Sequence, residues 1–247
     1  MPKTDKKTNP MGDARESELK DFNRFAEQVN ARKQEHFLEL FAKNRESFQI
    51  KKEKTIAKNL ERIFAATLKI SNEKGFHAMS MRDLSRETNL STGALYNYFS
   101  GKEDLLTMMQ AQRRAITRHF LVTAIDAGKT PVEKLRAAVT THLYLSEIMQ
   151  PWFYFSYMEA KNLYPQERQA AIQSEQNTEK MFTSILEDGV RQGIFECEDC
   201  LMTASMIKAM LQDWYLKRSK YSNRKVSVIQ YSRFLIAFLE KNLLAGR

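Results

Sequence analysis

The chain has 247 residues and a net charge of +9, and 43% of its residues are hydrophobic. This composition is typical of a globular protein long enough for one large or two modest cores, and it excludes overall disorder and collagen. Only eight Gly and five Pro occur, with long stretches that lack both, which disfavours a fold of many short strands and tight turns. The composition therefore predicts a mostly helical protein.

Export signals and membrane spans are not evident in the sequence. There is no run of about 18 apolar residues, and the first twenty residues are rich in Lys and Asp without an apolar segment. The two cysteines, Cys197 and Cys200, are too few for a disulfide framework, in agreement with a reducing compartment. We expect a cytoplasmic protein that does not enter the membrane.

The positive charge is unevenly distributed along the chain. Residues 51–114 hold twelve Lys and Arg against seven Asp and Glu, so over half of the excess lies in about a quarter of the sequence. A compact basic segment is typical of a nucleic-acid contact, because Lys and Arg displace counterions from phosphates. A well-solvated helical surface would give the same count.

The first fifty residues read as a tail followed by an amphipathic helix. Residues 1–12 are polar and predict a flexible tail. From Ala14 to about Phe48 no Pro or Gly occurs, and the gap at Arg32 and Lys33 leaves open one long helix or two shorter ones. The apolar face of this helix would pack on its own subunit, on a partner subunit or on another protein. A membrane surface is a further alternative. The apolar stripe consists of Leu19, Phe22, Ala26, Val29, Phe37, Leu40 and Phe41.

Cap signals divide the next segment into short helices. Residues 53–74 predict a helix that ends at Gly75 in a left-handed conformation. Ser80 and Asp83 have capping-box spacing, so a short helix should follow to about Thr88.

A turn at residues 89–91 then leads into a second short helix. Ser91 is the expected N-cap of this helix, Thr92 to Phe99, and residues 100–103 repeat the capping pattern before a longer helix from Lys102 to about Thr123.

Two short helices joined by a tight turn and flanked by longer ones have the layout of a helix-turn-helix DNA reader. Gly93 lets backbone approach a duplex, and Lys102 adds a cation to free amides at a helix start, which suits a phosphate. The residues expected to fix the crossing of the helices are Leu84, Leu90, Leu95 and Phe99. The residues left to face DNA are Thr92, Gly93, Tyr96, Asn97 and Tyr98.

The string SMRDLSRETNLSTGALYNYFSGKEDLL resembles the N-terminal DNA-binding domain of the TetR/AcrR family of bacterial transcriptional regulators, over about Thr55 to Leu106. The resemblance rests on Gly75-Phe76, on Gly93, Leu95, Tyr96, Tyr98 and Phe99, and on the Lys102-Glu103 pair. It implies a helix-turn-helix domain followed by a helical body.

The resemblance also implies roles for single residues. Candidates for base-edge contacts are Thr92, Gly93, Ala94 and Asn97. Candidates for phosphate contacts are Ser80, Tyr96, Tyr98 and Lys102. Arg82 is either a further phosphate ligand or a solvated helix residue, and Tyr96 would alternatively lie partly in the core.

The remainder of the chain predicts an all-helical body. Helices are expected from Pro131 to about Met149, from Pro151, from Pro165 to Gln192, and over 199–219 and 225–245. By resemblance to the family, the last two would form a four-helix bundle with a second copy and make the protein a homodimer. The residues expected at that interface are Leu201, Met202, Met206, Met210, Ile229, Phe234, Leu235, Phe238 and Leu239.

An effector pocket is predicted around the aromatic run Pro151–Met158, which is too apolar for a surface helix. Residues 152–163 and 189–195 loosely resemble the effector domain of fatty-acid and acyl-CoA responsive members of the family, which implies an apolar effector such as an acyl or acyl-CoA compound. Plain core packing is the alternative for each residue. The expected lining is Met149, Trp152, Phe155, Met158, Phe182, Ile185, Met210 and Trp214.

Other chemistry has weak support. Cys197 and Cys200 have redox spacing at a helix start, where a thiolate could be stabilised, but no second Cys/His pair accompanies them as a zinc site would require. No nucleophile elbow, phosphate-binding Gly loop or paired His motif occurs. We therefore expect no enzyme activity, no metal and no cofactor.

The sequence as a whole predicts three segments: an extension over residues 1–50, a DNA-binding domain over 51–106 and an effector-binding and dimerisation domain over 107–247. The expected function is a repressor that a small apolar effector releases from a palindromic DNA operator. The alternative is a protein-interaction factor that uses the same fold, with DNA as a secondary ligand.

Overall fold

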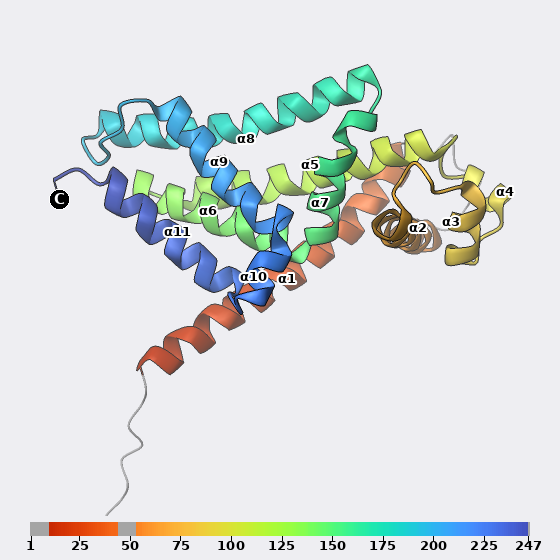
Figure 1. The fold of residues 1–247 in the computed structure, drawn as a ribbon, viewed down its shortest axis with the longest axis horizontal. Coiled ribbons are helices and arrows are strands. Elements are labelled where there is room, and N and C mark those ends of the chain that lie inside the picture. The colour runs from red at the N-terminus through yellow and green to blue at the C-terminus, as the bar shows by residue number, and fades with distance from the viewer. Residues whose placement is uncertain (1–9, 44–52, 247) are drawn as a thin grey trace, which may run out of the picture.

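A computed structural model describes residues 10–43 and 53–246 of the chain (Figure 1). Within these ranges the protein consists of helices and their connections, with one isolated bridge between Phe195 and Leu244, so the all-α prediction is confirmed. None of the helices in these ranges is long and apolar enough to cross a membrane. The elements are α1 (Pro10–Lys43), α2 (Glu53–Lys74), α3 (Met81–Thr88), α4 (Thr92–Tyr96), α5 (Lys102–Ala127), α6 (Pro131–Ile148), α7 (Gln150–Glu159), the 3₁₀ helix η1 (Ala160–Asn162), α8 (Pro165–Arg191), α9 (Cys200–Leu216), α10 (Arg218–Asn223) and α11 (Val228–Leu243).

Two hydrophobic clusters organise the helices. Helices α2, α3 and α4 gather at one end of the molecule around the first cluster, whereas α6, α8, α9 and α11 surround the second, as Figure 1 shows. Helix α5 joins both: Leu105 and Leu106 belong to the first cluster and Ile116 to the second. The predicted boundary at residue 106 thus falls inside a continuous helix, and the one at residue 50 lies outside the described residues; both stay predictions.

Most helix ends lie where the sequence signals place them. Gly75 has φ 83° and Gly193 has φ 68°, the left-handed conformation expected after α2 and α8. Thr130 and Glu133 form a capping box at the start of α6, with Pro131 in its first turn. These local signals were sufficient because each depends only on residues within one turn.

Two expectations on helix boundaries were wrong. Helix α4 ends at Tyr96 rather than Phe99, since Asn97 already caps it. The helix expected over 199–219 breaks at Lys217, and the break lets the Tyr221 ring lie 5.0 Å from that of Trp214. Helix α5 begins at Lys102 as predicted, although its N-cap, Gly101, makes no side-chain hydrogen bond; the Ser100 amide instead donates a 2.9 Å hydrogen bond to Asp104 Oδ2.

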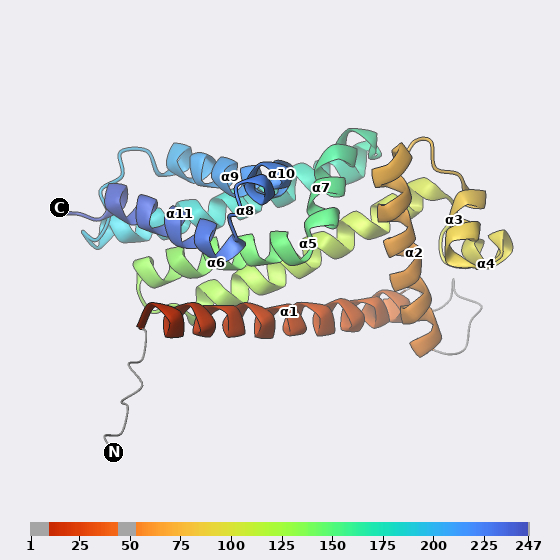
Figure 2. The same cartoon turned by 60° about the horizontal axis from the view of Figure 1, so that its bottom comes forward.

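Helix α1 lies along the body and reaches α2, as Figure 2 shows. It begins at Pro10, inside the predicted tail, and runs unbroken to Lys43; residues 1–9 and 44–48 of that prediction lie outside the described residues. Its inner face packs on its own subunit: Val29 is fully buried, and the rings of Phe22 and Phe25 lie 4.9 and 6.0 Å from that of Tyr144.

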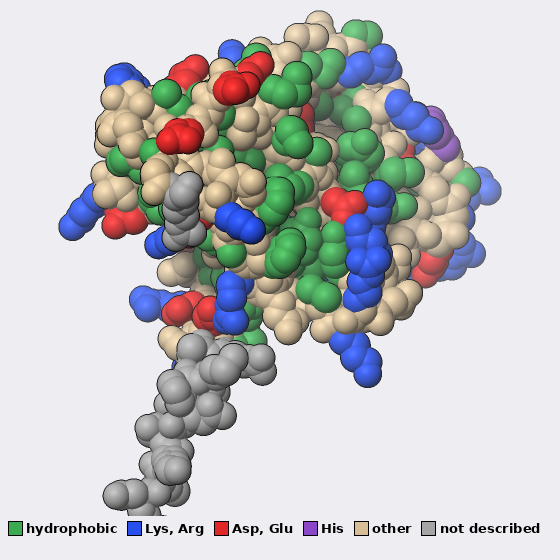
Figure 3. Space-filling model, turned by 60° about the vertical axis from the view of Figure 1, so that its left-hand side comes forward, with side chains coloured by type: hydrophobic (Ala, Val, Ile, Leu, Met, Phe, Trp, Pro, Cys, Tyr) green, Lys and Arg blue, Asp and Glu red, His purple; other side chains and the backbone are tan. Residues whose placement is uncertain are grey.

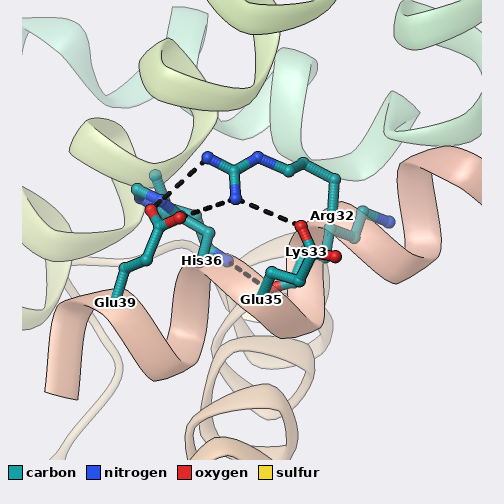
Figure 4. A network of polar contacts seen from close by, with 6 residues as sticks. Arg32, Lys33, Glu35, His36 and Glu39 are labelled. Carbon is teal, nitrogen blue, oxygen red and sulfur yellow. Dashed lines mark hydrogen bonds and ion pairs between the residues drawn. The ribbon is translucent and has the colours of Figure 1, made fainter. Parts of the chain in front are cut away.

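The gap in the apolar stripe of α1 has a polar explanation. Arg32 Nη1 lies 2.7 Å from Glu39 Oε1, and His36 Nδ1 lies 3.0 Å from Glu39 Oε2, along the side of α1 in Figure 4. The Lys33 carbonyl accepts a hydrogen bond of 3.4 Å from Gln112 Nε2 of α5. At this gap α1 contacts α5 of its own chain through a polar contact instead of an apolar one. This argues against the alternative that α1 docks on another protein.

We expect Phe25→Ala to lower the free energy of unfolding by about 2–3 kcal/mol, because it removes aromatic contacts with Phe120 and Tyr144 and leaves a cavity. Leu19→Ala is the matched control on the same helix, since Leu19 is 51% exposed, and should change the value by less than about 0.5 kcal/mol. Urea unfolding of the full chain measures both. Equal effects would contradict the packing of α1 on the body.

Candidate functional site

Helices α3 and α4 form a helix-turn-helix whose ends are fixed by side chains. The Ser80 hydroxyl accepts a 3.2 Å hydrogen bond from the Asp83 amide, and the Asp83 carboxylate accepts one of 2.9 Å from the Ser80 amide. Asn89 follows α3 with φ 50°, and Ser91 caps α4 by accepting from the Ala94 amide at 3.1 Å. The predicted capping box, turn and N-cap are confirmed, and the turn begins with Asn89 in the left-handed conformation.

Charge ties this unit to α2. Asp83 lies 2.7 Å from both Lys74 Nζ and Arg86 Nη2. The Lys74 ammonium, together with the donors of Ser80, holds the pKa of Asp83 well below its usual range. The carboxylate therefore stays ionised at neutral pH and links the end of α2 to the start of α3.

The predicted apolar contacts set the crossing of α3 and α4. Leu84 and Leu95 are fully buried, Phe99 is nearly so, and Leu90 packs at the edge of the same cluster. The cluster continues into Phe64 of α2. The helix pair is thus held rigidly on α2, and α4 is presented on the outside.

The predicted DNA contacts of the helix pair lie on or near its surface. Ser80, Arg82 and Gly93 are exposed. Tyr96 is 52% exposed, so the alternative that placed it in the core is wrong. No atom lies within 4 Å of the position where a Cβ of Gly93 would be, which leaves its backbone open to approach. Thr92, Ala94 and Asn97 are half-buried.

Two of the predicted phosphate ligands have other contacts. Tyr98 is only 5% exposed, and its hydroxyl accepts a 2.8 Å hydrogen bond from Asn59 Nδ2 of α2. Lys102 Nζ donates to the His77 carbonyl at 2.7 Å and lies over the Phe76 ring. The structure places Tyr98 in the core rather than on the surface, and it gives Lys102 a second task in holding the turn before α3.

A cavity of about 790 Å³ lies between α2 and α7, where the end of α9 and α10 complete the wall. Leu68 and Lys69 of α2 face Tyr154, Phe155 and Met158 of α7 across it. Its volume falls in the range of small-molecule sites, and most of these side chains are apolar or aromatic. It is therefore the candidate effector cavity.

The predicted pocket residues are divided between the cavity and the core. Phe155 and Met158 line the cavity. Met149, Phe182, Ile185 and Trp214 are buried in the second cluster, where Met210 also packs. The Trp152 ring packs edge-on against Phe64, with centroids 5.4 Å apart. For these six residues the structure supports the core-packing alternative.

Sequence reasoning missed the wall residues that come from distant helices, namely Leu68, Leu216 and Arg218. No local pattern marks them, because only the tertiary fold brings α2 beside α9 and α10. Arg218 is held in place by Glu147, which accepts two hydrogen bonds of 2.9 Å from its guanidinium and a third from the Trp214 indole at 3.1 Å.

The environment of Cys200 favours the thiol over the thiolate. Burial and the neighbouring Cys197 raise the pKa of Cys200 to about 11, and Cys197 Sγ lies 3.2 Å from Thr203 Oγ1. The expectation that the helix start would stabilise a thiolate was wrong, since burial outweighs any such effect. A redox role gains no support from this geometry.

Comparisons with known proteins agree with the fold and the helix-turn-helix. Residues 63–109 match the family described as "Bacterial regulatory proteins, tetR family", and residues 128–229 match "Tetracyclin repressor-like, C-terminal domain". The HTH-type transcriptional regulator HbdR of Aromatoleum sp. is 22% identical over 171 residues, which cover 69% of this chain and 75% of HbdR.

Solved structures share the architecture. The TetR family regulator PfmR of Thermus thermophilus superposes with a TM-score of 0.67 at 25% identity, over 75% of this chain and all of PfmR. AibR, solved with isovaleryl coenzyme A and operator DNA, gives 0.65 at 16% identity over 73% of this chain and 97% of AibR. With both matched domains and the helix-turn-helix in place, the chain belongs to the TetR family, whose members are transcriptional regulators and not enzymes.

Proposed function

We propose that this protein is a homodimeric repressor that binds a palindromic operator through α3 and α4 and leaves it when a small apolar effector binds. The observation that carries the proposal is that α3 and α4 are capped and packed on α2, with α4 exposed to solvent. Both helices also belong to the most basic segment of the chain, residues 51–114. Such a pair suits insertion of α4 into a major groove.

The roles within the helix pair follow from position and chemistry. Thr92, Gly93, Ala94 and Asn97 lie in or directly after α4 and would meet base edges. The exposed Ser80, Arg82 and Tyr96 would contact phosphates, which position the protein without reading sequence. Lys102 would add a phosphate contact and Tyr98 would support α4 from beneath.

A second copy would dock on the exposed apolar face of α9 and α11. That face includes Leu201, Met202 and Met206 of α9 and Phe234 and Phe238 of α11, all exposed. Hydrophobic side chains gather on the side of the molecule that carries the C-terminal end of α11 (Figure 3). A monomer rarely exposes so many large apolar groups together, so a symmetric four-helix contact is favoured. Leu235 and Leu239, predicted at the interface, instead belong to the core of the body.

Effector action is proposed to run through α2. A molecule in the 790 Å³ cavity would press on Leu68 and Lys69, whose helix also carries the helix-turn-helix. The AibR complex with an acyl-CoA supports acyl or acyl-CoA compounds as the effector class. A ligand that binds the arrangement unable to bind DNA a hundredfold more tightly than the DNA-binding arrangement shifts the equilibrium between them by about 2.7 kcal/mol towards release from DNA.

Substitutions at Lys102 and Asn97 should separate the two kinds of DNA contact. Lys102→Ala should weaken binding to all duplexes and lower the salt slope by about 1, whereas Asn97→Ala should mainly change sequence preference. Fluorescence anisotropy across a salt series, with the upstream region of the gene and a random duplex, measures both. The control is Lys129→Ala, an exposed lysine in the α5–α6 turn. Identical losses for both variants on both duplexes would contradict the division of roles.

The proposed dimer can be broken at its most exposed aromatic. Phe234 is 71% exposed in the single chain, so Phe234→Glu should convert a dimer into a folded monomer by burying a charge in the contact. Light scattering after gel filtration measures the mass. Tyr157→Glu, at an exposed aromatic of α7, is the control and should remain dimeric. A wild-type monomer would contradict the proposed interface.

The effector class can be tested on operator binding. Isovaleryl-CoA, octanoyl-CoA and stearoyl-CoA should be compared with free CoA, and at least one acyl compound should weaken operator binding by about tenfold or more. Ala65→Trp places an indole in the cavity and should abolish this response while operator binding persists. Release by free CoA alone, or no release by any acyl compound, would contradict the proposed effector.

A further inference from the structure

Two ion pairs connect α3 to α2, one near each end of α3. Near the start of α3, Asp83 lies 2.7 Å from Lys74 Nζ, and near its end Glu87 lies 2.7 Å from Lys69 Nζ. Leu84, between these two carboxylates in the chain, is fully buried. The way in which α3 lies on α2 thus depends on both ion pairs as well as on apolar packing.

The candidate effector cavity reaches one of these ion pairs and not the other. Lys69 lines the cavity, whereas Lys74, Asp83 and Glu87 are not among its lining residues. A molecule inside the cavity can therefore contact the ammonium group of the Lys69–Glu87 pair while the carboxylate of that pair stays outside.

The Lys69–Glu87 pair is weak enough for a ligand to replace. The side chains of Lys69 and Glu87 are 54% and 36% exposed, and exposed ion pairs contribute little to stability. Arg218, the second cation of the lining, is fixed more firmly. Its guanidinium donates two hydrogen bonds of 2.9 Å to Glu147 and lies over the Trp214 ring.

The polar part of the lining suits an anion. Lys69 and Arg218 outnumber the one acidic residue of the lining, Glu159. Arg218 Nη1 and Ser71 Oγ are buried without hydrogen-bond partners among the described residues, and both residues line the cavity. Buried polar atoms are almost always paired in native proteins, so both atoms favour an occupant with hydrogen-bond acceptors.

We propose that Lys69 couples the cavity to the helix pair: an anionic group on an apolar molecule binds Lys69, displaces Glu87 and loosens α3 from α2. The inference rests on the proposed function, because it takes this cavity as the effector site. It adds the charge of the effector and the residue that senses this charge. Leu84 and Leu95 pack in one cluster, so α4 follows α3.

The expected size of the coupling follows from the exposure of the pair. Loss of one exposed ion pair should weaken operator binding by roughly two- to fivefold in each subunit. The two subunits of a dimer are far apart at this position, so their factors multiply.

Calorimetry of the full chain with decanoate and with decanamide, its neutral match, tests the need for an anion. Decanoate should bind at least about fivefold more tightly than decanamide. Lys69→Met should reduce this preference to less than about twofold, whereas Lys69→Arg should keep it because the cation remains. Glu87→Gln should bind decanoate at least as tightly as the wild type does, since no carboxylate then competes for Lys69.

Fluorescence anisotropy with the upstream region of the gene tests the coupling. The ligand is whichever of isovaleryl-CoA, octanoyl-CoA and stearoyl-CoA weakens wild-type binding most. This weakening should shrink by at least about threefold in Lys69→Met and in Glu87→Gln. Lys74→Met is the matched control, because it breaks the other ion pair between α2 and α3 outside the cavity, and its response should stay within about twofold of the wild type.

The outcomes separate this inference from the proposed function. No binding of decanoate, equal binding of decanoate and decanamide, or an unchanged preference in Lys69→Met would overturn the inference. Release of Lys69→Met and Glu87→Gln as in the wild type would remove the role of Lys69 and leave the proposed function intact. A wild type that none of the three acyl-CoA compounds releases would contradict both.

Discussion

Helix α2 is the element on which the remaining structure depends, because it is packed on opposite sides by the two halves of the molecule. Phe64 lies in one cluster with Leu84 and Leu95 of the helix pair and also packs against Trp152 of α7. Interiors are close-packed, so such a helix cannot shift on one side without carrying its neighbours on the other. The position of α4 is thereby tied to the state of the body.

The candidate effector cavity lies on this helix, so the effector action proposed above would have a physical route. Lys69 lines the cavity and forms an ion pair of 2.7 Å with Glu87 of α3. Helix α1 adds a second connection, since it runs from the body to α2.

The sequence predicted those features that are encoded locally. Gly75, Ser80 and Ser91 indicated helix ends through a left-handed turn and two N-caps that involve only neighbouring residues. The break at Lys217 was missed because it depends on the packing of Tyr221 against Trp214, which no local pattern records. The core position of Tyr98 was missed because its partner, Asn59, lies on another helix.

The binding pockets were the hardest features to predict. An aromatic run such as Pro151–Met158 indicates burial, but it does not separate core from cavity wall, so most of the expected lining proved to be core. One usable signal was overlooked: Lys208 lies on the apolar stripe of α9 with Ala204 and Leu211, and a lysine at such a position indicates a nearby carboxylate, which is Glu175 at 3.2 Å.

The central claim, that the exposed α4 of a symmetric dimer reads DNA, is tested most directly by selecting bound sequences from a random duplex pool with the full-length protein at physiological salt. The account predicts enrichment of an inverted repeat whose half-site centres lie roughly 34–36 Å apart, one helical turn. Salt-sensitive binding that enriches no repeat would contradict it, because the helix pair would then contact only phosphates.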